Sequence, residues 1–256
     1  MKLNKAFTDK KAFIAFVTCG DPDIETTKKL ALALDKNGAD IIELGMPFSD
    51  PVAEGPVIQS ANVRSLANGC TTDKIFDMIQ ELKGSIKAPV ILTTYTNVVF
   101  SYGIERFCKK ASEVGVSGIV IPDIPYEEKQ EFSAPCKNNG IDYISLVAST
   151  SEKRIEMIAK EAEGFVLCTS TLAADEEREK RYIFNMVNDI KKVCDLPIVA
   201  GLDVSSVSQA VRLAAMTDGV IVDCAIVEIV EKYKEKSPEY VAKLAAEIRS
   251  KLDEIK

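Results

Sequence analysis

Eight short apolar runs rich in β-branched residues recur along the chain, and this repeat constrains the fold more than any other feature. In order, they are AFIAFVT (12–18), ADIIELGM (39–46), PVILTTY (89–95), GIVIPDI (118–124), DYISLVA (142–148), GFVLCTS (164–170), PIVAGLD (197–203) and GVIVDCA (219–225). The stretches between them show helical periodicity with charged faces. Nearly apolar strands that alternate with helices indicate a parallel sheet covered on both faces. Eight such units predict an α/β fold, a single (β/α)8 TIM barrel that spans residues 1–256 as one domain.

The main alternative is a doubly wound open sheet. Such a sheet normally carries a glycine-rich dinucleotide-binding turn after its first strand. The turn here reads TCGDPD, at residues 18–23, and lacks that fingerprint. We therefore favour the closed barrel, followed by an amphipathic helix in the C-terminal stretch SPEYVAKLAAEIRSKLDEIK.

Composition excludes several classes of function. The net charge is −7 and the basic residues are scattered among acids, which argues against binding to nucleic acid or to a membrane surface. A small molecule or another protein is the expected partner. The sequence contains no histidine, which excludes Ser-His-Asp and Cys-His nucleophiles, histidine-bound zinc and imidazole acid-base catalysis. Any proton transfer must fall to Asp, Glu, Lys, Tyr or Cys.

The cysteines and the first residues bear on localisation. The seven cysteines are widely spaced and never form a Cys-x-x-Cys pair, which indicates reduced thiols in the cytoplasm. The first eleven residues, MKLNKAFTDKK, lack the apolar core of a signal peptide. No apolar run is long enough to span a bilayer, so we expect a cytoplasmic protein.

Two intervals after strands are longer than the repeat requires. One follows the second strand and reads PFSDPVAEGPVIQSANVRSLANGCTTD, and the other follows the sixth strand and reads TLAADEEREKRYIF. Such insertions lie on the C-terminal face of a (β/α)8 barrel, where these enzymes place their active sites. The second strand carries Glu43, and Glu54 follows eleven residues later. Because a buried acid is costly unless it is paired or used, both are candidate functional groups.

The residues around these two acids resemble a known family. The stretch ELGMPFSDPVAEGPVIQ, with AFVTCGDPD before it and TYTNVVFSYGIERF, GIVIPDIPYEE and DGVIVDCAIV after it, resembles the tryptophan synthase α-subunit family over nearly the whole chain. The resemblance implies a carbon-carbon lyase that cleaves indole-3-glycerol phosphate to indole and glyceraldehyde 3-phosphate, with neither a metal nor an organic cofactor. It also implies a PLP-containing β subunit as partner, which receives the indole within an α-β-β-α complex.

The resemblance assigns roles to individual residues. Glu43 matches the family's acid-base residue, which delivers a proton to the indole C3 and takes one from the glycerol hydroxyl. Glu54 matches the second carboxylate, which accepts a hydrogen bond from the indole N–H; the family has Asp there, so one methylene displaces the carboxylate here. The same match makes substrate-binding candidates of Phe16, Thr93, Tyr95, Leu167, Gly201, Ser205 and Cys224.

The phosphate-binding segments depart from the family pattern. The resemblance places the phosphate on backbone N–H groups after strand seven and at a helix N-terminus after strand eight. Asp203 and Asp223 stand where the family has glycines. A carboxylate repels a phosphate dianion and a Cβ atom hinders close backbone approach, so we expect weaker binding of phosphate esters. Asp223 as a helix N-cap and Asp203 in a turn are compatible with that expectation.

The loop after strand six departs as well. Its counterpart of the family's lid runs from Ser170 to Glu176 and lacks the glycine hinges. Asp175 would face Glu54 with like charge, which disfavours closure. Other matched residues, at or near the family's contact with the β subunit, are Pro47, Asp50, Pro51, Asn97 and Asp123.

Three functions remain open from the sequence. The first is the indole-3-glycerol-phosphate lyase of the family, with low efficiency when alone, and we favour it. The second is a barrel lyase whose substrate lacks the phosphate or carries a positive group there, as Asp203 and Asp223 suggest. The third is a non-catalytic regulatory subunit that still docks on a β-type partner through the loop from Pro47 to Pro51.

Overall fold

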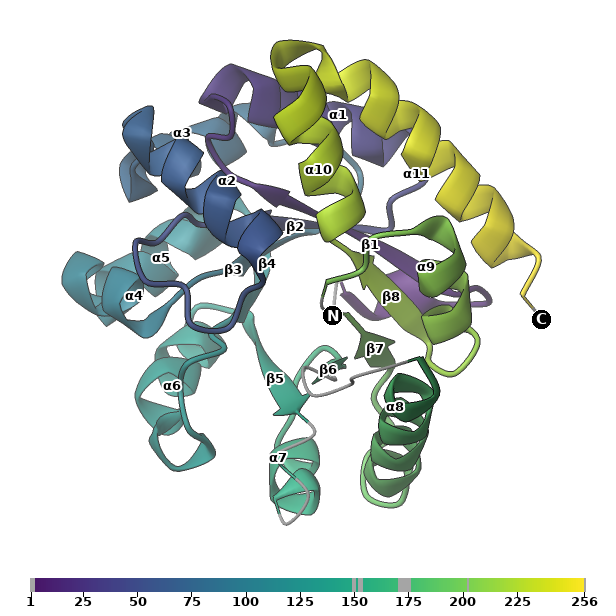
Figure 1. Ribbon diagram of the computed structural model, residues 1–256. Coiled ribbons are helices and arrows are strands. Elements are labelled where there is room, and N and C mark those ends of the chain that lie inside the picture. Colours follow the sequence, from purple (N-terminus) through teal and green to yellow (C-terminus); the bar gives the residue numbers. More distant parts are fainter. Residues whose placement is uncertain (1–2, 149–150, 152–153, 170–175, 202, 256) are drawn as a thin grey trace.

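Eight parallel strands close into a barrel in the computed structural model, and helices form the outer ring (Figure 1). The strands are β1 (Ala12–Thr18), β2 (Ile41–Gly45), β3 (Val90–Thr93), β4 (Val116–Val120), β5 (Asp142–Ala148), β6 (Val166–Thr169), β7 (Ile198–Ala200) and β8 (Gly219–Val222). They pair in sequence order, and β8 returns to pair with β1. The structure describes all residues except 1–2, 149–150, 152–153, 170–175, 202 and 256. The predicted barrel is confirmed.

Most helices return the chain from one strand to the next. The α-helices are α1 (Ile24–Lys36), α2 (Pro56–Ala67), α3 (Thr72–Leu82), α4 (Thr96–Tyr102), α5 (Ile104–Val114), α6 (Gln130–Asn138), α7 (Ile155–Lys160), α8 (Glu176–Lys191), α9 (Val207–Ala214), α10 (Cys224–Tyr233) and α11 (Ser237–Asp253). Short 3-10 turns are η1 (Leu3–Phe7), η2 (Tyr126–Glu128) and η4 (Lys234–Lys236). The expected C-terminal helix is α11, which packs on α1 and α10. Within the described part of the chain, no helix has the length and apolar character that crossing a bilayer would require.

Both insertions contain more helix than the sequence analysis expected. The first holds α2, which begins after Gly55 with Pro56 at its first position, where a missing N–H costs nothing. The second is shorter than expected because α8 already begins at Glu176. Its run of acids therefore opens a helix, where negative charge is favourable near the N-terminus.

Side chains alternate along each strand: one faces the barrel interior and the next faces the layer of helices. In β1, Ile14 and Phe16 belong to the interior cluster. Phe13, Ala15 and Val17 belong to the cluster under the helices. All seven residues of β1 are buried, so the strand has no solvent-facing side. This two-sided burial explains why the strands read as continuous apolar runs.

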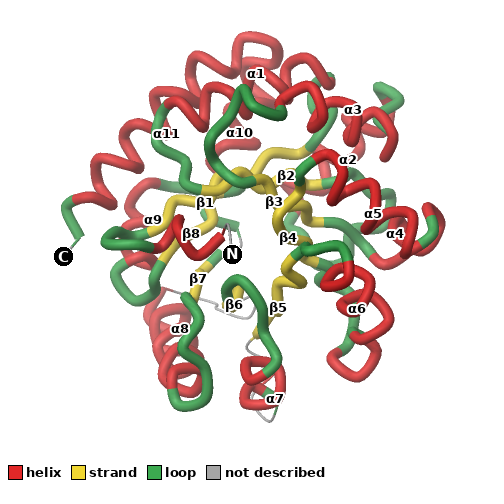
Figure 2. Tube along the Cα trace, turned by 180° about the vertical axis from the view of Figure 1, so that it is seen from behind, coloured by secondary structure: helices red, strands yellow, loops and turns green. Residues whose placement is uncertain are grey.

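The chain's own first residues fill the N-terminal end of the barrel. Leu3 of η1 is fully buried, and the ring of Phe7 packs on Phe165 with centroids 5.7 Å apart. A Cβ atom on Gly118 or Gly164 would lie 3.1 to 3.2 Å from the Leu3 side chain, so these two glycines make room for it. Figure 2 shows the N-terminal end of the chain close to the barrel axis. The interior is packed at this end, and its polar groups lie toward the opposite mouth.

Candidate active site

The interior alternation carries polar side chains to the C-terminal mouth of the barrel. On β2, Glu43 follows the interior residue Ile41 by two positions. At the end of β8, Asp223 follows the interior residue Ile221 in the same way. Because alternate residues share a face of a strand, both acids project into the barrel above its apolar floor. Strand geometry therefore places two carboxyl groups at the same level of one cavity.

The cavity at this mouth has a volume of about 220 Å³. Apolar residues of β4, β5 and β8 form much of its wall, as is usual for a small-molecule site. Seven of the residues singled out from the sequence line it: Phe16, Glu43, Glu54, Thr93, Leu167, Gly201 and Asp223. Tyr95, Ser205 and Cys224 are not among the described residues that line the cavity, and each contacts residues beside it instead.

Glu43 is buried in the cavity wall, with 4% of its surface exposed. Its Oε1 accepts a hydrogen bond from the Thr93 hydroxyl. Its Oε2 has no hydrogen-bond partner among the described residues. Burial raises the pKa of Glu43 to about 7, the Thr93 hydrogen bond opposes that rise, and the charges of Asp223 and Glu54 add to it. The carboxyl group can therefore give or take a proton at neutral pH.

Glu54 lies on the loop between β2 and α2, and α2 supplies one of its partners. The Asn62 Nδ2 donates a hydrogen bond to Glu54 Oε2 over 2.6 Å. Burial raises the pKa of Glu54 to about 7. Hydrogen bonds from Asn62 and Tyr95 lower this pKa, whereas the charges of Asp223 and Asp203 raise it. Glu43 and Glu54 therefore ionise over the same range of pH, near pH 7.

Tyr95 holds the loop that carries Glu54. Its ring stacks on Phe48 with centroids 5.2 Å apart, and its hydroxyl accepts a hydrogen bond from the Ala53 N–H over 3.3 Å. The same hydroxyl donates to the Glu54 carboxyl group. Burial and the charge of Glu54 keep the pKa of Tyr95 well above its usual value, so the hydroxyl stays a donor. Tyr95 is thus a support for the loop and for Glu54.

Two apolar side chains face the cavity beside these acids. Phe16 of β1 is the register partner of Glu43, so its ring lies next to the carboxyl group. A Cβ atom on Gly45 would collide with that ring, and the glycine is therefore required for the ring's position. Leu167 reaches the cavity from β6 and is 6% exposed. The floor suits a flat apolar group held close to Glu43.

Asp223 joins the start of α10 to the turn after β7. Its Oδ1 accepts hydrogen bonds from the Cys224 N–H over 2.7 Å and from the Val204 N–H over 2.6 Å, and its Oδ2 accepts from the Asp203 N–H over 2.9 Å. The predicted helix cap is confirmed. Burial raises the pKa of Asp223 to about 6 although the backbone hydrogen bonds oppose this. The carboxylate thus holds two loops together.

Asp203 lies beside Asp223 and spans the mouth. Its φ of 53° is in the left-handed region, which Asp tolerates better than most residues. Its carboxylate Oδ1 lies 3.5 Å from the Cys224 Sγ and also faces Gly55, where a Cβ atom would collide with it. The ligand atoms of Asp203, Asp223 and Cys224 lie within 4.8 Å of one another, close enough for a metal ion. The backbone hydrogen bonds to Asp223 already stabilise this arrangement by themselves.

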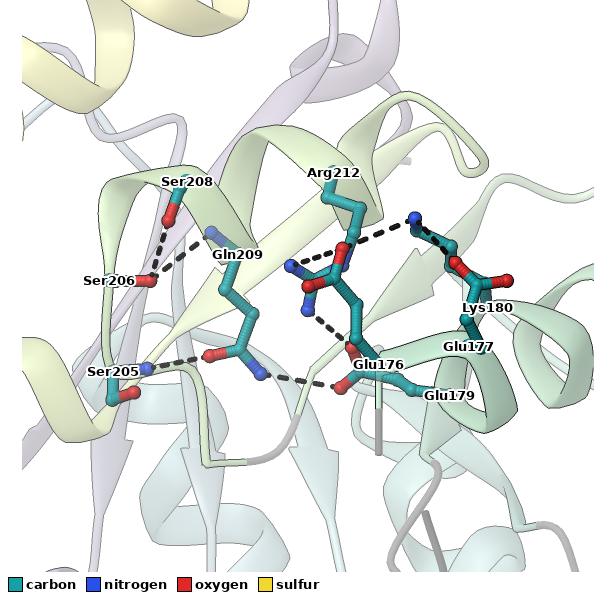
Figure 3. Close-up of polar contacts among 9 residues, drawn as sticks. All are labelled: Glu176, Glu177, Glu179, Lys180, Ser205, Ser206, Ser208, Gln209 and Arg212. Atoms are coloured by element: carbon teal, nitrogen blue, oxygen red, sulfur yellow. Dashed lines mark hydrogen bonds and ion pairs between the residues drawn. The ribbon is translucent and has the colours of Figure 1, made fainter. Parts of the chain in front are cut away.

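Ser205 does not point a free backbone donor at the cavity. Its N–H donates to the Gln209 Oε1 over 3.1 Å, and the Gln209 Nε2 donates to Glu179 of α8 (Figure 3). Arg212 in turn pairs with Glu179 over 2.6 Å. The turn after β7 is therefore tied to α8 and α9.

The residues predicted at a partner interface lie in different environments. Asp50 and Asn97 are exposed, whereas Pro47 is buried and supports its loop from within. Pro51 is half-buried. The Asp123 carboxylate accepts hydrogen bonds from the Thr96 N–H and hydroxyl over 3.0 and 2.9 Å, so it fixes the start of α4.

Exposed apolar side chains flank these positions and were not singled out from the sequence. Val52, two residues after Asp50, is 80% exposed, and Phe100, three residues after Asn97, is 63% exposed. Tyr95 contacts the first loop and precedes α4 directly, so it brings the two segments together. Each segment thus carries one large exposed apolar side chain, Val52 on the loop after β2 and Phe100 on α4.

Sequence analysis also missed residues inside the site. Asn62 is buried in α2 and orients Glu54, and Thr169 lines the cavity with its hydroxyl buried. The signal available in the sequence was the spacing alone: the polar Asn62 follows the apolar Ile58 by four positions, which puts both on one face of a helix. The predicted lid residues 170–175, and with them the expected approach of Asp175 to Glu54, lie outside the described residues.

Comparisons with known proteins agree with one another. A model of the family described as tryptophan synthase alpha chain matches residues 3–256. The tryptophan synthase alpha chain of Lacticaseibacillus casei is 41% identical over 254 residues, which are 98% of this chain and 96% of that protein. The one from Geotalea uraniireducens (strain Rf4) is 41% identical over 255 residues, 96% of each chain.

Solved structures are similar over the same extent. A structure from Aquifex aeolicus VF5 has a TM-score of 0.90 and 33% sequence identity, covering 99% of both chains. A structure of Mycobacterium tuberculosis tryptophan synthase has a TM-score of 0.89 and 28% sequence identity, covering 98% of both chains. The likeness in sequence and in fold therefore extends along the whole barrel.

Proposed function

The chain belongs to the tryptophan synthase alpha chain family, and from this premise we propose how its barrel performs the lyase reaction of tryptophan biosynthesis. The reaction cleaves indole-3-glycerol phosphate to indole and glyceraldehyde 3-phosphate. Of the three functions considered above, family membership favours this one. The observation that carries the mechanism is Glu43, a buried carboxyl group in an apolar cavity, one oxygen of which has no hydrogen-bond partner in the described part of the chain.

Glu43 acts as acid and then as base. As the protonated acid, it delivers its proton to the indole C3, which makes the bond between C3 and the glycerol carbon breakable. As the carboxylate, it takes the proton of the glycerol hydroxyl while that bond breaks and the aldehyde forms. A pKa of about 7 suits both steps, because neither protonation state is strongly disfavoured at neutral pH.

Glu54 acts on the other side of the ring. As a carboxylate, it accepts a hydrogen bond from the indole N–H and stabilises the positive charge that grows on the ring when C3 is protonated. Asn62 and Tyr95 donate to Glu54, which favours its ionised form and fixes its orientation. One glutamate protonated and the other ionised is therefore the active combination.

The remaining cavity residues bind and orient the substrate. Phe16 and Leu167 supply apolar surface for the indole ring, and Thr93 holds Glu43 through its hydroxyl. Gly201 lines the opposite part of the cavity, toward the turn after β7. This arrangement positions the indole against Glu43 and its phosphorylated side chain toward the turn.

A β-type subunit is the proposed partner, in an α-β-β-α complex within the cytoplasm. The exposed Val52 and Phe100, beside Asp50 and Asn97, support a docking surface next to the cavity mouth. We expect Phe100→Asp to weaken binding of a tryptophan synthase β subunit by tenfold or more, at roughly 1.4 kcal/mol per tenfold. Phe184→Asp is the matched control, because Phe184 on α8 is also exposed, at 58%. Equal loss in both variants would remove the proposed surface.

The lyase function is tested by indole release from indole-3-glycerol phosphate, measured with the purified chain alone and with a β subunit added. We expect release in both conditions and a faster rate in the second. Release that does not respond to the partner would contradict the docking proposal. No release in either condition would contradict the assignment of Glu43 and Glu54.

A further inference from the structure

The walls of the cavity restrict where the phosphate of a substrate can lie. The indole end is defined by Phe16, Leu167 and Glu43, so the phosphate must lie toward Gly201 and Asp223. No lysine or arginine is present among the described residues that line the cavity. Besides the hydroxyls of Thr93 and Thr169, backbone N–H groups are therefore the donors available to an anion, and α10, a helix of ten residues, begins at this wall.

The available N–H groups are already occupied by the chain's own side chains. Asp223 accepts from Asp203, Val204 and Cys224 over 2.6 to 2.9 Å. These are charge-assisted hydrogen bonds, because the acceptor is a carboxylate that is itself 4% exposed. A carboxylate and a phosphate use the same donors and carry the same sign of charge, so they cannot both occupy this position favourably.

A fourth backbone donor, the N–H of Ser205, is occupied by a neutral side chain. The N–H of Ser205 donates to the Gln209 side chain, which is held by Glu179, and Glu179 is held by Arg212 (Figure 3). Gln209 is neutral and more exposed than Asp223, so it is the weaker competitor for its donor. The Asp223 carboxylate is therefore the stronger of the two competitors for the backbone N–H groups at this wall, and the charge of Asp203 adds to the repulsion of an anion.

We propose that Asp223 is an internal competitor for the substrate phosphate and so a specificity-determining residue of this enzyme. Its carboxylate fills the position of the phosphate, and a phosphate ester binds only after this side chain leaves the N–H groups of Val204, Asp203 and Cys224. The proposal rests on the proposed function in one respect, that the substrate is a phosphate ester bound in this cavity. It predicts weak binding of phosphate esters by the unmodified chain and tight binding once Asp223 is removed.

The test uses isothermal titration of the full chain with inorganic phosphate and with glycerol 3-phosphate. We expect Asp223→Gly to bind both probes at least about tenfold more tightly, because the donors are freed and a negative charge is removed. Asp223→Asn should give an intermediate gain, since its amide oxygen still accepts a hydrogen bond but carries no charge. Gln209→Ala should give a smaller gain than either.

Asp218→Asn is the matched control. The Asp218 carboxylate also accepts a backbone hydrogen bond, from the Ile198 N–H over 2.9 Å, but it precedes β8 at the opposite end of the barrel. The phosphate affinity of the Asp218→Asn variant should equal that of the unmodified chain. Unchanged or weaker phosphate binding in both Asp223→Gly and Asp223→Asn, with both folded by circular dichroism, would overturn the proposal.

A second measurement covers the case in which Asp223→Gly loses its helix cap and does not fold. Phosphate titrated into Asp223→Asn should shift the amide ¹⁵N resonances of Val204 and Cys224. Shifts confined to other residues would place the anion elsewhere and overturn the proposal.

Indole release separates this inference from the proposed function. Suppose that the Asp223 variants bind phosphate more tightly but neither they nor the unmodified chain release indole. The proposed lyase mechanism would then be wrong, and the proposal that Asp223 competes with phosphate would stand. If indole is released but Asp223→Gly does not lower the KM, the proposal that Asp223 competes with phosphate would be wrong, and the lyase mechanism would stand.

Discussion

Two pairs of acids face each other across the mouth of the barrel, and their surroundings differ. Glu43 and Glu54, on the β2 side, receive side-chain hydrogen bonds, and one oxygen of Glu43 has no partner among the described residues. Asp223, on the β8 side, receives hydrogen bonds from three backbone N–H groups, and its neighbour Asp203 lies across from Gly55. Glu43 and Asp223 are equally buried, whereas Asp203 is exposed, and the two sides differ in the hydrogen bonds that their acids receive.

This difference shows that hydrogen bonding, more than residue type, decides what a buried acid can do. A carboxylate whose oxygens are held by backbone donors is a structural anion, because any change of its charge or position breaks several bonds at once. A carboxyl group with an unused oxygen can exchange a proton with a ligand. The comparison predicts that substitutions on the β2 side affect turnover and that substitutions on the β8 side affect binding.

The largest expected effect is on turnover and comes from Glu43→Gln. The amide cannot transfer the proton, so we expect kcat for indole release to fall by about 10²–10⁴-fold, as for removal of a general acid or base. Affinity for glycerol 3-phosphate should not change, because the position that we propose for the phosphate is on the β8 side. Glu247→Gln, an exposed acid on α11, is the control. Undiminished turnover in Glu43→Gln would remove the distinction between the two sides.

The next effect is on stability as a function of pH. Glu43 and Glu54 ionise near pH 4.5 in the unfolded chain and near pH 7 in the folded one. Between these values the native state binds more protons, so the free energy of unfolding falls as the pH rises. With about 1.4 kcal/mol per pKa unit, reduced by coupling between the acids, we expect a total loss of roughly 2–4 kcal/mol.

Urea denaturation at pH 5, 6, 7 and 8 measures this loss. Glu43→Gln should make the profile less steep, because one of the three acids whose pKa burial raises, Glu43, Glu54 and Asp223, no longer titrates, and Glu247→Gln should leave it unchanged. A profile that is already flat for the unmodified chain would mean that the two glutamates are not held neutral by burial.

A smaller effect is expected from Glu54→Gln. The amide can still accept the indole N–H through its oxygen but supplies no negative charge to the protonated ring, so kcat should fall by about 10²-fold. Glu54→Asp keeps the charge and should retain more activity than the amide variant. Equal losses in the two variants would show that the position of the group matters and its charge does not.

The smallest effect is expected from Asn62→Leu, which leaves both glutamates in place. Loss of the hydrogen bond to Glu54 should raise the pKa of that residue, because the bond stabilises its ionised form. The acid limb of the pH profile of kcat should therefore move to higher pH, by up to about one unit. A lower kcat with an unmoved acid limb would mean that Asn62 only supports the loop.

The strands and the interior direction of Glu43 could be predicted from the sequence. The run ADIIELGM identifies β2, and the alternation from Ile41 to Glu43 places the acid inside once the barrel is assumed. The helix α2 also had a signal, Gly55 followed by Pro56, which is typical of a helix start. The role of Glu43 came from the resemblance of its surroundings to a family, since periodicity alone does not indicate chemistry.

The partners of the acids could not be predicted from the sequence. Asp223 contacts Val204, which lies 19 residues earlier, and this contact exists only because β7 and β8 are neighbours in a closed barrel. The contact between Asp203 and Gly55 joins opposite sides of the mouth. Both depend on the direction of individual side chains, and many directions are compatible with the same strand pattern. Capping was therefore predictable for Asp223, whereas its hold on the turn after β7 was not.

The residues packed into the N-terminal end of the barrel also bear on how molecules travel through this protein. The N-terminal end is filled by Leu3, Phe7 and Phe165, so the described part of the barrel is closed at that end. Substrate and both products must therefore pass through the opposite mouth, where the loop that carries Glu54 lies. A protein docked on the loop after β2, which carries the exposed Val52, would therefore lie beside the opening through which indole leaves, and would affect the release of indole as well as receive it.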